Sequence, residues 1–384
     1  MNNSNPLILK EISKTYPNKV NALTKIDLTI HPGETMACIG PNGCGKTTLL
    51  KIIAGLLKPT SGSISFQTSS FQKSPPWKRN IGWVSHNAAL YPFWKIEKQL
   101  TVLRQKKKTL LARKKETIER FQLQDLLDRY PHQVSSGQRQ RIALAKSWLN
   151  QPEILLLDEP FTNLDLYQKE HLRQELADLI RSRKGRGITL LVSHEPQVAK
   201  SLADQMIVLS GGELKQCGTY YELQNFPEHI EVAKSICFPT MNFLSLRLHP
   251  SEPCLVHSVS NRTLFQLEDD DYKKLTTRKE LSESFVIGID PHDLEMITIE
   301  ESKQGIDPPT RGFLVSAPIE LNSTETGANS TLYRLSSMDK VLKLRVDTLA
   351  TYPANVGEKV IVRCSIKKIH WFHKRTGMRI EIGL

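Results

Sequence analysis

A glycine-rich segment near residue 40 contains the residue types that bind phosphate groups. It fits the spacing G-x-x-x-x-G-K-T, followed by a second threonine, and its residues are Gly40, Pro41, Asn42, Gly43, Cys44, Gly45, Lys46, Thr47 and Thr48. Glycines let backbone N–H groups come close to phosphate oxygens, and the start of the next helix favours negative charge. A lysine at this spacing reaches the β- and γ-phosphates, and the next hydroxyl binds Mg²⁺. The segment predicts a site for ATP and Mg²⁺.

Two acidic residues end an apolar run in the middle of the chain. Asp158 and Glu159 directly follow the run 154–157. Beside a phosphate loop, a carboxylate at a strand end can complete the coordination of Mg²⁺, which we assign to Asp158. A second carboxylate can orient the attacking water and accept its proton, which we assign to Glu159. The alternative, in which the two acids only cap the following turn, is disfavoured by the phosphate loop in the same chain.

These groups require strands that end close together and helices that begin there. The sequence predicts strands at 26–30, 35–39, 153–157 and 187–192, and helices at 47–57, 168–183 and throughout 95–150. Strands that alternate with helices predict a mostly parallel sheet covered on both faces. The expected fold is therefore an α/β P-loop NTPase.

The sequence changes character after about residue 240. Short apolar runs such as 285–289 and 360–364 are separated by Gly, Pro, Ser and Thr clusters, which is typical of a small all-β domain with one or two barrels. Residues 241–384 hold 19 basic and 19 acidic residues, so the net charge of +12 lies in residues 1–240. Within that part, residues 95–150 hold 14 basic and 5 acidic residues. A solvated helix face is one explanation, and a surface facing anionic lipid or nucleic acid is the other.

Composition limits the class of protein. No stretch approaches the ~20 apolar residues that span a bilayer. The first residues lack the basic and apolar regions of a secretory signal, so we expect a cytosolic protein. Six cysteines occur without a C-x-x-C pair, which indicates neither a zinc site nor a disulfide framework.

The segment 134–141, VSSGQRQR, resembles the signature of the ABC ATPase family, normally Leu-Ser-Gly-Gly-Gln, and departs from it at Val134 and Ser136. A helical run follows, so the segment lies at a helix start and forms a second place suited to an anion. The resemblance implies a head-to-tail pair of cassettes, in which each ATP lies between the phosphate loop of one and the signature of the other. The signature residues expected to bind nucleotide are Ser135, Ser136, Gly137 and Gln138.

Three more positions extend the resemblance over residues 7–225. Asp165 ends the segment TNLD, which is similar to the family's loop after the catalytic glutamate. His194 stands where the family has its switch histidine, which contacts the γ-phosphate. Tyr16 stands where the family stacks an aromatic ring on adenine, with ordinary packing as the alternative. The resemblance thus implies that Glu159, His194 and Lys46 are catalytic.

Two residues of this expected site are unusual. His86 ends the segment IGWVSH, where the family places a glutamine that touches Mg²⁺ and water and reports the nucleotide state to membrane subunits. We expect His86 to take part in catalysis and in metal binding, and an imidazole can also titrate. Cys44, beside Lys46 and a helix start, is expected to be an accessible thiol with a lowered pKa. The alternative for Cys44 is a tolerated variable position.

The C-terminal part resembles the TOBE (OB-like) β-barrel domain of importer ATPases for maltose-type sugars and glycerol phosphate. The segments IGIDPHDL (287–294) and IHWFHKRTG (369–377) carry this similarity, with departures at Asp290 and His292. The predicted domains are a cassette at 1–236, with a helical subdomain at about 95–150, and a regulatory or dimerisation barrel at 237–384.

The resemblance also implies partners and a location. We expect a homodimer, or a pair with a related cassette, on integral-membrane permease subunits at the cytoplasmic face of the inner membrane, served by an extracytoplasmic solute-binding protein. Import of a carbohydrate or related solute is the expected function. Two alternatives stay open: an exporter motor, and a soluble ABC ATPase acting on ribosomes or nucleic acid. A neutral β-domain is a poor grip for nucleic acid, so no nucleic acid is expected as a partner.

Overall fold

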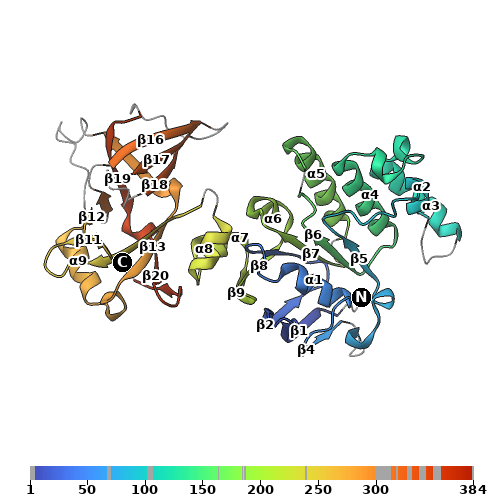
Figure 1. Ribbon diagram of the computed structural model, residues 1–384, viewed down its shortest axis with the longest axis horizontal. Helices are drawn as coiled ribbons and strands as arrows, with labels where there is room; N and C mark the ends of the chain where they lie inside the picture. The colour runs from blue at the N-terminus through green and yellow to red at the C-terminus, as the bar shows by residue number, and fades with distance from the viewer. Residues whose placement is uncertain are drawn as a thin grey trace. The chain divides into compact units, whose positions relative to one another are not determined.

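The computed structural model divides the chain into two units, Met1–Tyr221 and Glu222–Leu384 (Figure 1). It describes residues 5–66, 71–101, 107–162, 164–183, 185, 187–237, 240–298, 313–316, 319–326, 331–336, 343–348 and 356–382. Among these residues, no helix has both the length and the apolar character needed to cross a membrane.

The first unit is built on two sheets. Its strands are β1 (Leu7–Thr15), β2 (Asn21–Ile30), β3 (Thr35–Ile39), β4 (Ser61–Ser65), β5 (Ile81–Val84), β6 (Ile154–Asp158), β7 (Ile188–Ser193), β8 (Gln205–Ser210) and β9 (Glu213–Gly218). The larger sheet has the order β5-β6-β7-β3-β8-β9, and its neighbours from β5 to β8 are parallel. The smaller, antiparallel sheet has the order β2-β1-β4. This arrangement confirms the α/β fold predicted from the sequence.

Helices cover both faces of the larger sheet. They are α1 (Lys46–Ala54), α2 (Ile96–Gln99), α3 (Lys107–Arg120), α4 (Ser136–Leu149), α5 (Leu166–Ser182) and α6 (Pro196–Leu202), and α7 (Tyr220–Asn225) spans the division between the units. Along β6, Ile154 and Leu156 pack in the core with α1, whereas Leu155 and Leu157 pack in the core with α4 and α5. Alternate side chains of a strand point to opposite faces, so the unbroken apolar run serves both cores. Figure 1 shows α1 and α5 on opposite sides of this sheet.

Two sequence predictions of helices need correction. The helix predicted at 47–57 ends at Ala54, because Gly55 adopts a left-handed C-cap conformation with φ 77°. The stretch 95–150 is not helical throughout: between α3 and α4 the chain forms turns and the 3₁₀ helices η3 (Gln124–Leu126) and η4 (Pro131–Gln133). Proline fits the first turn of η4 but lacks the N–H that a continuing helix requires. Residues 102–106 of this prediction lie outside the described residues.

The second unit contains a large antiparallel sheet. Its strands are β10 (Asn242–Leu248), β11 (Cys254–His257), β12 (Thr263–Gln266), β13 (Phe285–Ile289), β14 (Leu294–Thr298), β15 (Phe313–Ser316), β16 (Ile319–Thr326), β17 (Thr331–Ser336), β18 (Lys343–Thr348), β19 (Lys359–Ser365), β20 (His370–His373) and β21 (Arg379–Ile380). The sheet order is β18-β17-β16-β19-β15-β12-β11-β10-β13-β20-β21, and β14 also pairs with β19. The structure therefore confirms a second, β-rich unit after the cassette.

Within the described residues, the β-rich unit also contains the helices α8 (Ile230–Ile236) and α9 (Asp269–Thr276). Helix α8 begins next to the end of the chain, where the N–H of Ile230 donates to the carbonyl of Gly377 at 2.8 Å. Its Ala233 packs in one apolar cluster with Phe372 of β20. The division at Tyr221 therefore falls earlier than the boundary at 236/237 that the sequence suggests, and that boundary stays a prediction.

Candidate nucleotide-binding site

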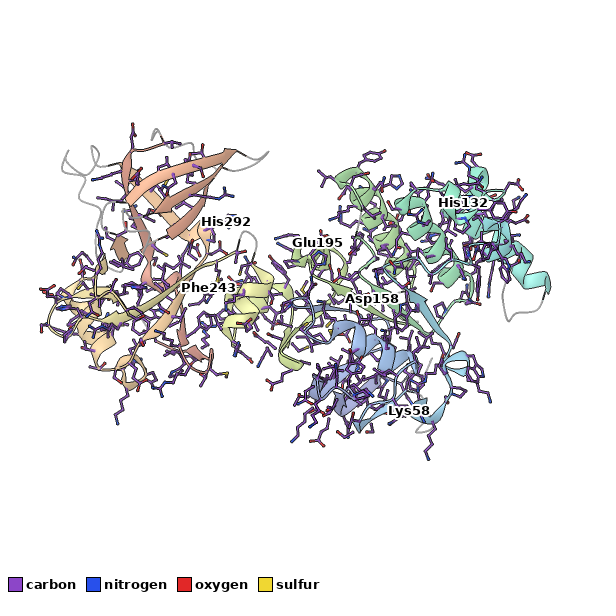
Figure 2. All side chains as sticks on the ribbon, viewed as in Figure 1. Lys58, His132, Asp158, Glu195, Phe243 and His292 are labelled. Carbon is purple, nitrogen blue, oxygen red and sulfur yellow. The ribbon has the colours of Figure 1, made fainter. Side chains whose placement is uncertain are left out.

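The four parallel strands that carry the predicted site residues end at one edge of the larger sheet. Strand β3 leads into the phosphate loop, β6 ends at Asp158, β7 is followed by His194, and β5 is followed by His86. In sheets of this kind ligands bind outside the carboxyl ends of the strands. Figure 2 shows Asp158 toward the middle of the first unit, with Lys58 and His132 at its periphery.

The phosphate loop holds its lysine close. The Lys46 ammonium donates to the carbonyl oxygens of Gly40 at 2.7 Å and Pro41 at 3.0 Å. Gly45 has φ 108°, and a Cβ there would lie 2.4 Å from the carbonyl oxygen of Ala22, so only glycine fits between the loop and β2. Helix α1 begins at Lys46, which directs its free N–H groups toward the loop.

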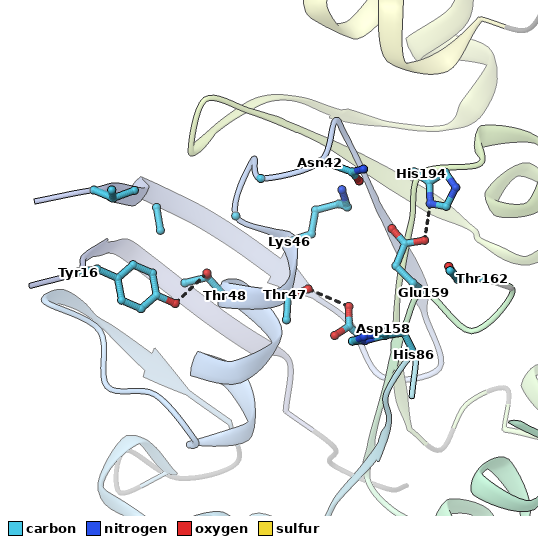
Figure 3. A pocket seen from close by; sticks show the side chains of 14 residues that line it. Tyr16, Asn42, Lys46, Thr47, Thr48, His86, Asp158, Glu159, Thr162 and His194 are labelled. Atoms are coloured by element: carbon cyan, nitrogen blue, oxygen red, sulfur yellow. Dashed lines mark hydrogen bonds and ion pairs between the residues drawn. The ribbon is translucent and has the colours of Figure 1, made fainter. Parts of the chain in front are cut away.

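A cavity of about 490 Å³ opens at this edge of the sheet (Figure 3). Its lining residues are Tyr16, Val20, Ala22, Asn42, Gly43, Gly45, Lys46, Thr47, Thr48, His86, Asp158, Glu159, Thr162 and His194. Tyr16 lies at one end, where its hydroxyl is 3.2 Å from Thr48 Oγ1, and His86 and Thr162 lie at the other (Figure 3). The size and the polar lining suit a nucleotide, with its base near Tyr16 and its phosphates along α1.

The oxygen groups beside the loop fit a divalent cation. The Thr47 hydroxyl donates to Asp158 Oδ1 at 3.1 Å, and Asp158 is only 2% exposed. Burial raises the pKa of Asp158, although the Thr47 hydrogen bond and His86 oppose the rise. Burial of a carboxylate is costly unless a cation compensates it, and Mg²⁺ prefers oxygen ligands. Thr47 and Asp158 together are therefore a fitting donor set for Mg²⁺.

Glu159 and His194 form a close pair across the cavity. Glu159 Oε2 and His194 Nδ1 are 2.6 Å apart (Figure 3). Glu159 has φ 51°, a left-handed conformation that is uncommon for a residue other than glycine. Such strain persists only when the surrounding structure enforces it, and it concentrates at functional sites. The pair can orient a water molecule beside the phosphates and accept a proton from it.

The predicted signature residues lie at the start of α4, away from this cavity. Ser135 is the N-cap: its hydroxyl accepts from Gln138 N at 3.2 Å, and Gln138 Oε1 accepts from Ser135 N at 2.9 Å. Asp165 likewise caps α5, accepting from Gln168 N at 2.8 Å. The structure thus gives Ser135 and Asp165 capping contacts within the chain. The predicted nucleotide contacts of Ser135, Ser136, Gly137, Gln138 and Asp165 need a second cassette and stay predictions.

The structure corrects the expectation for Cys44. Its side chain is 4% exposed, and a Cβ on Gly40 would lie 2.8 Å from its sulfur, so the thiol packs beneath the loop. Burial raises the pKa of Cys44 despite the opposing charge of Lys46. The predicted accessible thiol of lowered pKa is therefore wrong. Gly40, Pro41 and Cys44 are not part of the cavity lining among the described residues.

Three lining residues were not selected as site residues from the sequence: Val20, Ala22 and Thr162. Val20 and Ala22 reach the cavity because β1 and β2 form a hairpin that returns the chain past Tyr16. The only sequence signal for them is nearness to Tyr16. Thr162 opens the TNLD segment, whose Asn163 lies outside the described residues.

The fold and this cavity define an α/β P-loop protein that binds ATP. Residues 23–162 match the family model described as ABC transporter. The sn-glycerol-3-phosphate import ATP-binding protein UgpC of Chromohalobacter salexigens is 32% identical over 382 residues, which cover 98% of this chain and 96% of that protein. The trehalose import ATP-binding protein SugC of Mycobacterium tuberculosis is 32% identical over 349 residues, which cover 90% and 85%.

Two solved structures are similar to the first unit. An ATP-binding subunit of an ABC transporter has a TM-score of 0.51 and 26% identity, covering 57% of this chain and 92% of that chain. The dimeric structure of a bacterial ABC transporter cassette has a TM-score of 0.50 and 29% identity, covering 56% and 98%. The chain belongs to the ATP-binding proteins of the ABC transporter family and is an ATPase.

Proposed function

We propose that this ATPase drives the import of a carbohydrate or related solute through separate membrane subunits. The observation that carries the proposal is the extent of the similarity. The match to the glycerol-phosphate import protein runs over 98% of the chain and so includes the β-rich unit, not only the cassette. The relatives handle sn-glycerol-3-phosphate and trehalose, two small hydroxylated solutes, which supports the same broad class here.

A pair of cassettes completes the proposed site. Each chain holds one nucleotide cavity, and the start of its α4 lies apart from that cavity. A two-fold homodimer, or a pair with a related cassette, would bring Ser135 and Gly137 of one chain to the nucleotide of the other. The dimeric structure of the similar bacterial cassette supports this arrangement. ATP then stabilises the closed pair, and hydrolysis allows it to open.

Six residues of the cavity have a proposed role in hydrolysis or beside it. Lys46 and the N-terminal amides of α1 bind the phosphates, and Thr47 with Asp158 holds Mg²⁺, with His86 close to this pair. When bound, Mg²⁺ neutralises charge on the phosphates and aligns them. Glu159 accepts the proton of the attacking water. His194, held by Glu159, donates a hydrogen bond toward the γ-phosphate.

The proposed partners are integral-membrane permease subunits and an extracytoplasmic solute-binding protein. The cassette would then lie on the cytoplasmic face of the inner membrane, without a spanning segment of its own. The test is to co-express the chain with candidate permease subunits of the same organism, in cells lacking their own uptake system. Radiolabelled trehalose, maltose and glycerol 3-phosphate are supplied as solutes.

Uptake of one solute by the intact protein, and its loss with Glu159→Gln, would support the proposal. ATP-dependent efflux would replace import by export. Pelleting of the chain with ribosomes rather than membranes would assign it to a different class of ABC ATPase.

A further inference from the structure

A second, smaller cavity adjoins the nucleotide cavity in the first unit. Its volume is about 140 Å³, and its lining residues are His86, Asn87, Ala88, Ser136, Arg139, Gln140, Thr162 and Leu164. His86 and Thr162 line both cavities, so the two spaces adjoin at these residues. Figure 3 shows both residues at the end of the nucleotide cavity away from Tyr16.

The smaller cavity contains buried polar groups that await a partner. Gln140 is 4% exposed, and its Nε2 has no hydrogen-bond partner within the described part of the chain. Thr162 Oγ1 is also a buried atom without a hydrogen-bond partner among the described residues. A buried donor without a partner destabilises the folded state, and native structures rarely keep one unless a water or ion satisfies it. Both groups therefore point to a polar occupant.

The lining selects an anion. None of the eight lining residues is acidic, whereas Arg139 is a cation and Gln140 and Thr162 offer N–H and O–H groups. The two bonds of Arg139 to the carbonyls of Val134 and Pro131 both use Nη1, and a guanidinium has five N–H groups in all. Ser136 begins α4, a helix of 14 residues, whose start favours negative charge.

Two departures of this chain from the family motifs meet here. His86 replaces the family's glutamine, and Ser136 replaces a signature glycine, and both line the smaller cavity. Ser136 adds a hydroxyl where the family has no side chain, whereas His86 exchanges one hydrogen-bonding group for another. The chain has thus added one donor to this space.

We propose that this cavity binds inorganic phosphate, the product of ATP hydrolysis, after it leaves the catalytic position. One water molecule needs about 10–15 Å³ of such cavity volume, so the smaller cavity has room for a tetrahedral oxyanion and accompanying water. Phosphate oxygens accept bonds from Gln140 Nε2, the Thr162 hydroxyl and Arg139. The inference rests on the hydrolysis in the proposed function, but phosphate binding is measurable without hydrolysis or transport.

The test is a titration of the full-length chain with sodium phosphate at constant ionic strength. Saturating non-hydrolysable ATP analogue and Mg²⁺ are present, so that a γ-phosphate already fills the phosphate loop. Thermal unfolding reports binding, because a ligand of the folded state raises Tm with its concentration. The wild type should show a saturable rise in Tm that chloride does not give.

Gln140→Met should weaken the apparent phosphate affinity about tenfold or more, since hydrogen bonds to charged groups are strong. The chain offers a matched control in Gln99, which is equally buried but has a bonded amide: Nε2 donates to Tyr91 O at 2.6 Å and Trp94 O at 3.2 Å. Gln99→Met should lower Tm and leave the phosphate affinity unchanged. Gln140→Met should not lower Tm in the absence of phosphate.

Thr162→Val provides a second variant, with the same expected loss of phosphate affinity, should Gln140→Met fail to fold. Absence of any phosphate-dependent rise in the wild type would overturn the proposal, as would equal affinities in the wild type and in both variants. Loss of solute uptake in the transport test, with phosphate binding intact, would instead overturn only the proposed function.

Discussion

The nucleotide cavity of the first unit and the sheet around β14 and β19 of the β-rich unit use their polar side chains in different ways. In the β-rich unit the charged groups around β14 and β19 pair with one another: Asp293 with Lys368 at 2.6 Å, and Glu295 with Arg363 at 2.6 Å. In the nucleotide cavity of the first unit, the buried Asp158 accepts a hydrogen bond from the neutral Thr47 hydroxyl, and no cation forms an ion pair with it among the described residues.

The difference separates a region built for stability from one built for a ligand. A sheet that satisfies its own charges gains little from an added ion. A buried carboxylate with a raised pKa, a strained Glu159 and a loop of free N–H groups instead gain from binding. We therefore expect substitutions at the nucleotide cavity to damage activity while sparing or increasing stability, and substitutions in the β-rich unit to do the reverse.

The largest expected effect is at Glu159. Glu159→Gln should lower the ATPase rate about 10²- to 10⁴-fold, because an amide cannot take a proton from water. ATP should still bind and should trap a closed dimer, detectable by gel filtration. Glu213→Gln, in an ion pair with Lys215 at the surface of the same unit, is the control and should stay close to wild type. Near-normal turnover by Glu159→Gln would remove that residue from the role of base.

Asp158→Asn should separate activity from stability. Burial raises the pKa of Asp158 above the ordinary value of an aspartate, so the folded state holds its proton more tightly than the unfolded state. Stability is therefore lost as pH rises from about 4 through the raised pKa, and the loss persists at neutral pH. The variant should melt higher than wild type at pH 7, equally at pH 3, and should lose the stabilisation by Mg²⁺-ATP. A lower Tm at pH 7 would contradict the contrast between the units.

In the β-rich unit the pH dependence should have the opposite sign. Burial, aided by the charge of Arg379, lowers the pKa of His370 to about 4. Since the unfolded state binds this proton more readily, stability should fall as pH drops from about 6.5 toward 4. His370→Phe should remove this part of the acid sensitivity without changing the ATPase rate. His373→Phe, on the same strand, is the control, and an unchanged acid profile in His370→Phe would speak against the assignment.

A smaller effect is expected at His86. His86 lines the nucleotide cavity close to Asp158, one of the proposed Mg²⁺ ligands. His86→Gln should therefore change the ATPase rate by a few-fold, measured with and without membrane subunits. Equal rates for the wild type and the variant in both settings would exclude a role for His86 in the chemistry.

Thiol labelling should distinguish the exposed cysteine from the buried ones without affecting the ATPase activity. Cys217 is exposed, whereas the other five cysteines are buried. Maleimide should modify the native protein at one site, and Cys217→Ser should abolish the labelling. Fast labelling of Cys44 in that variant would show that the loop opens far more than the structure indicates.

The sequence was sufficient for the parts of the site that are continuous in the chain. The phosphate loop and the Asp158–Glu159 pair follow from local spacing, and the structure places them at one sheet edge. The Lys-, Gln-, Leu- and Arg-rich composition of residues 95–150 predicts an unbroken helix, but Pro131 between α3 and α4 has no N–H to continue one. The pKa of Cys44 was misjudged because Lys46 is a neighbour in sequence, whereas burial depends on the folded structure.

The smaller cavity could not be found from sequence. Its donors come from three segments, near residues 86, 140 and 162, that meet only after the chain folds. Nothing local in Gln140 shows that its amide would lack a partner. By contrast, the alternation along β6 could be read directly, since period two assigns Leu155 and Leu156 to opposite faces.

Strand β7 lies between β3 and β6 and therefore sets the distance between the two strands that carry the phosphate loop and Asp158. Neighbouring strands are ~4.8 Å apart, so β3, which leads into the phosphate loop, and β6, which ends at Asp158, run about 10 Å apart, and helix α1 brings Thr47 back to 3.1 Å from Asp158. Lengthening the turns at the other end of the strands leaves this distance between β3 and β6 unchanged. A single residue inserted inside β7 would move every later side chain of this strand to the opposite face and would turn His194 away from Glu159. Tags and labels are thus best inserted in the turns at the end of the sheet opposite the nucleotide cavity, and β7 is the strand least tolerant of insertions.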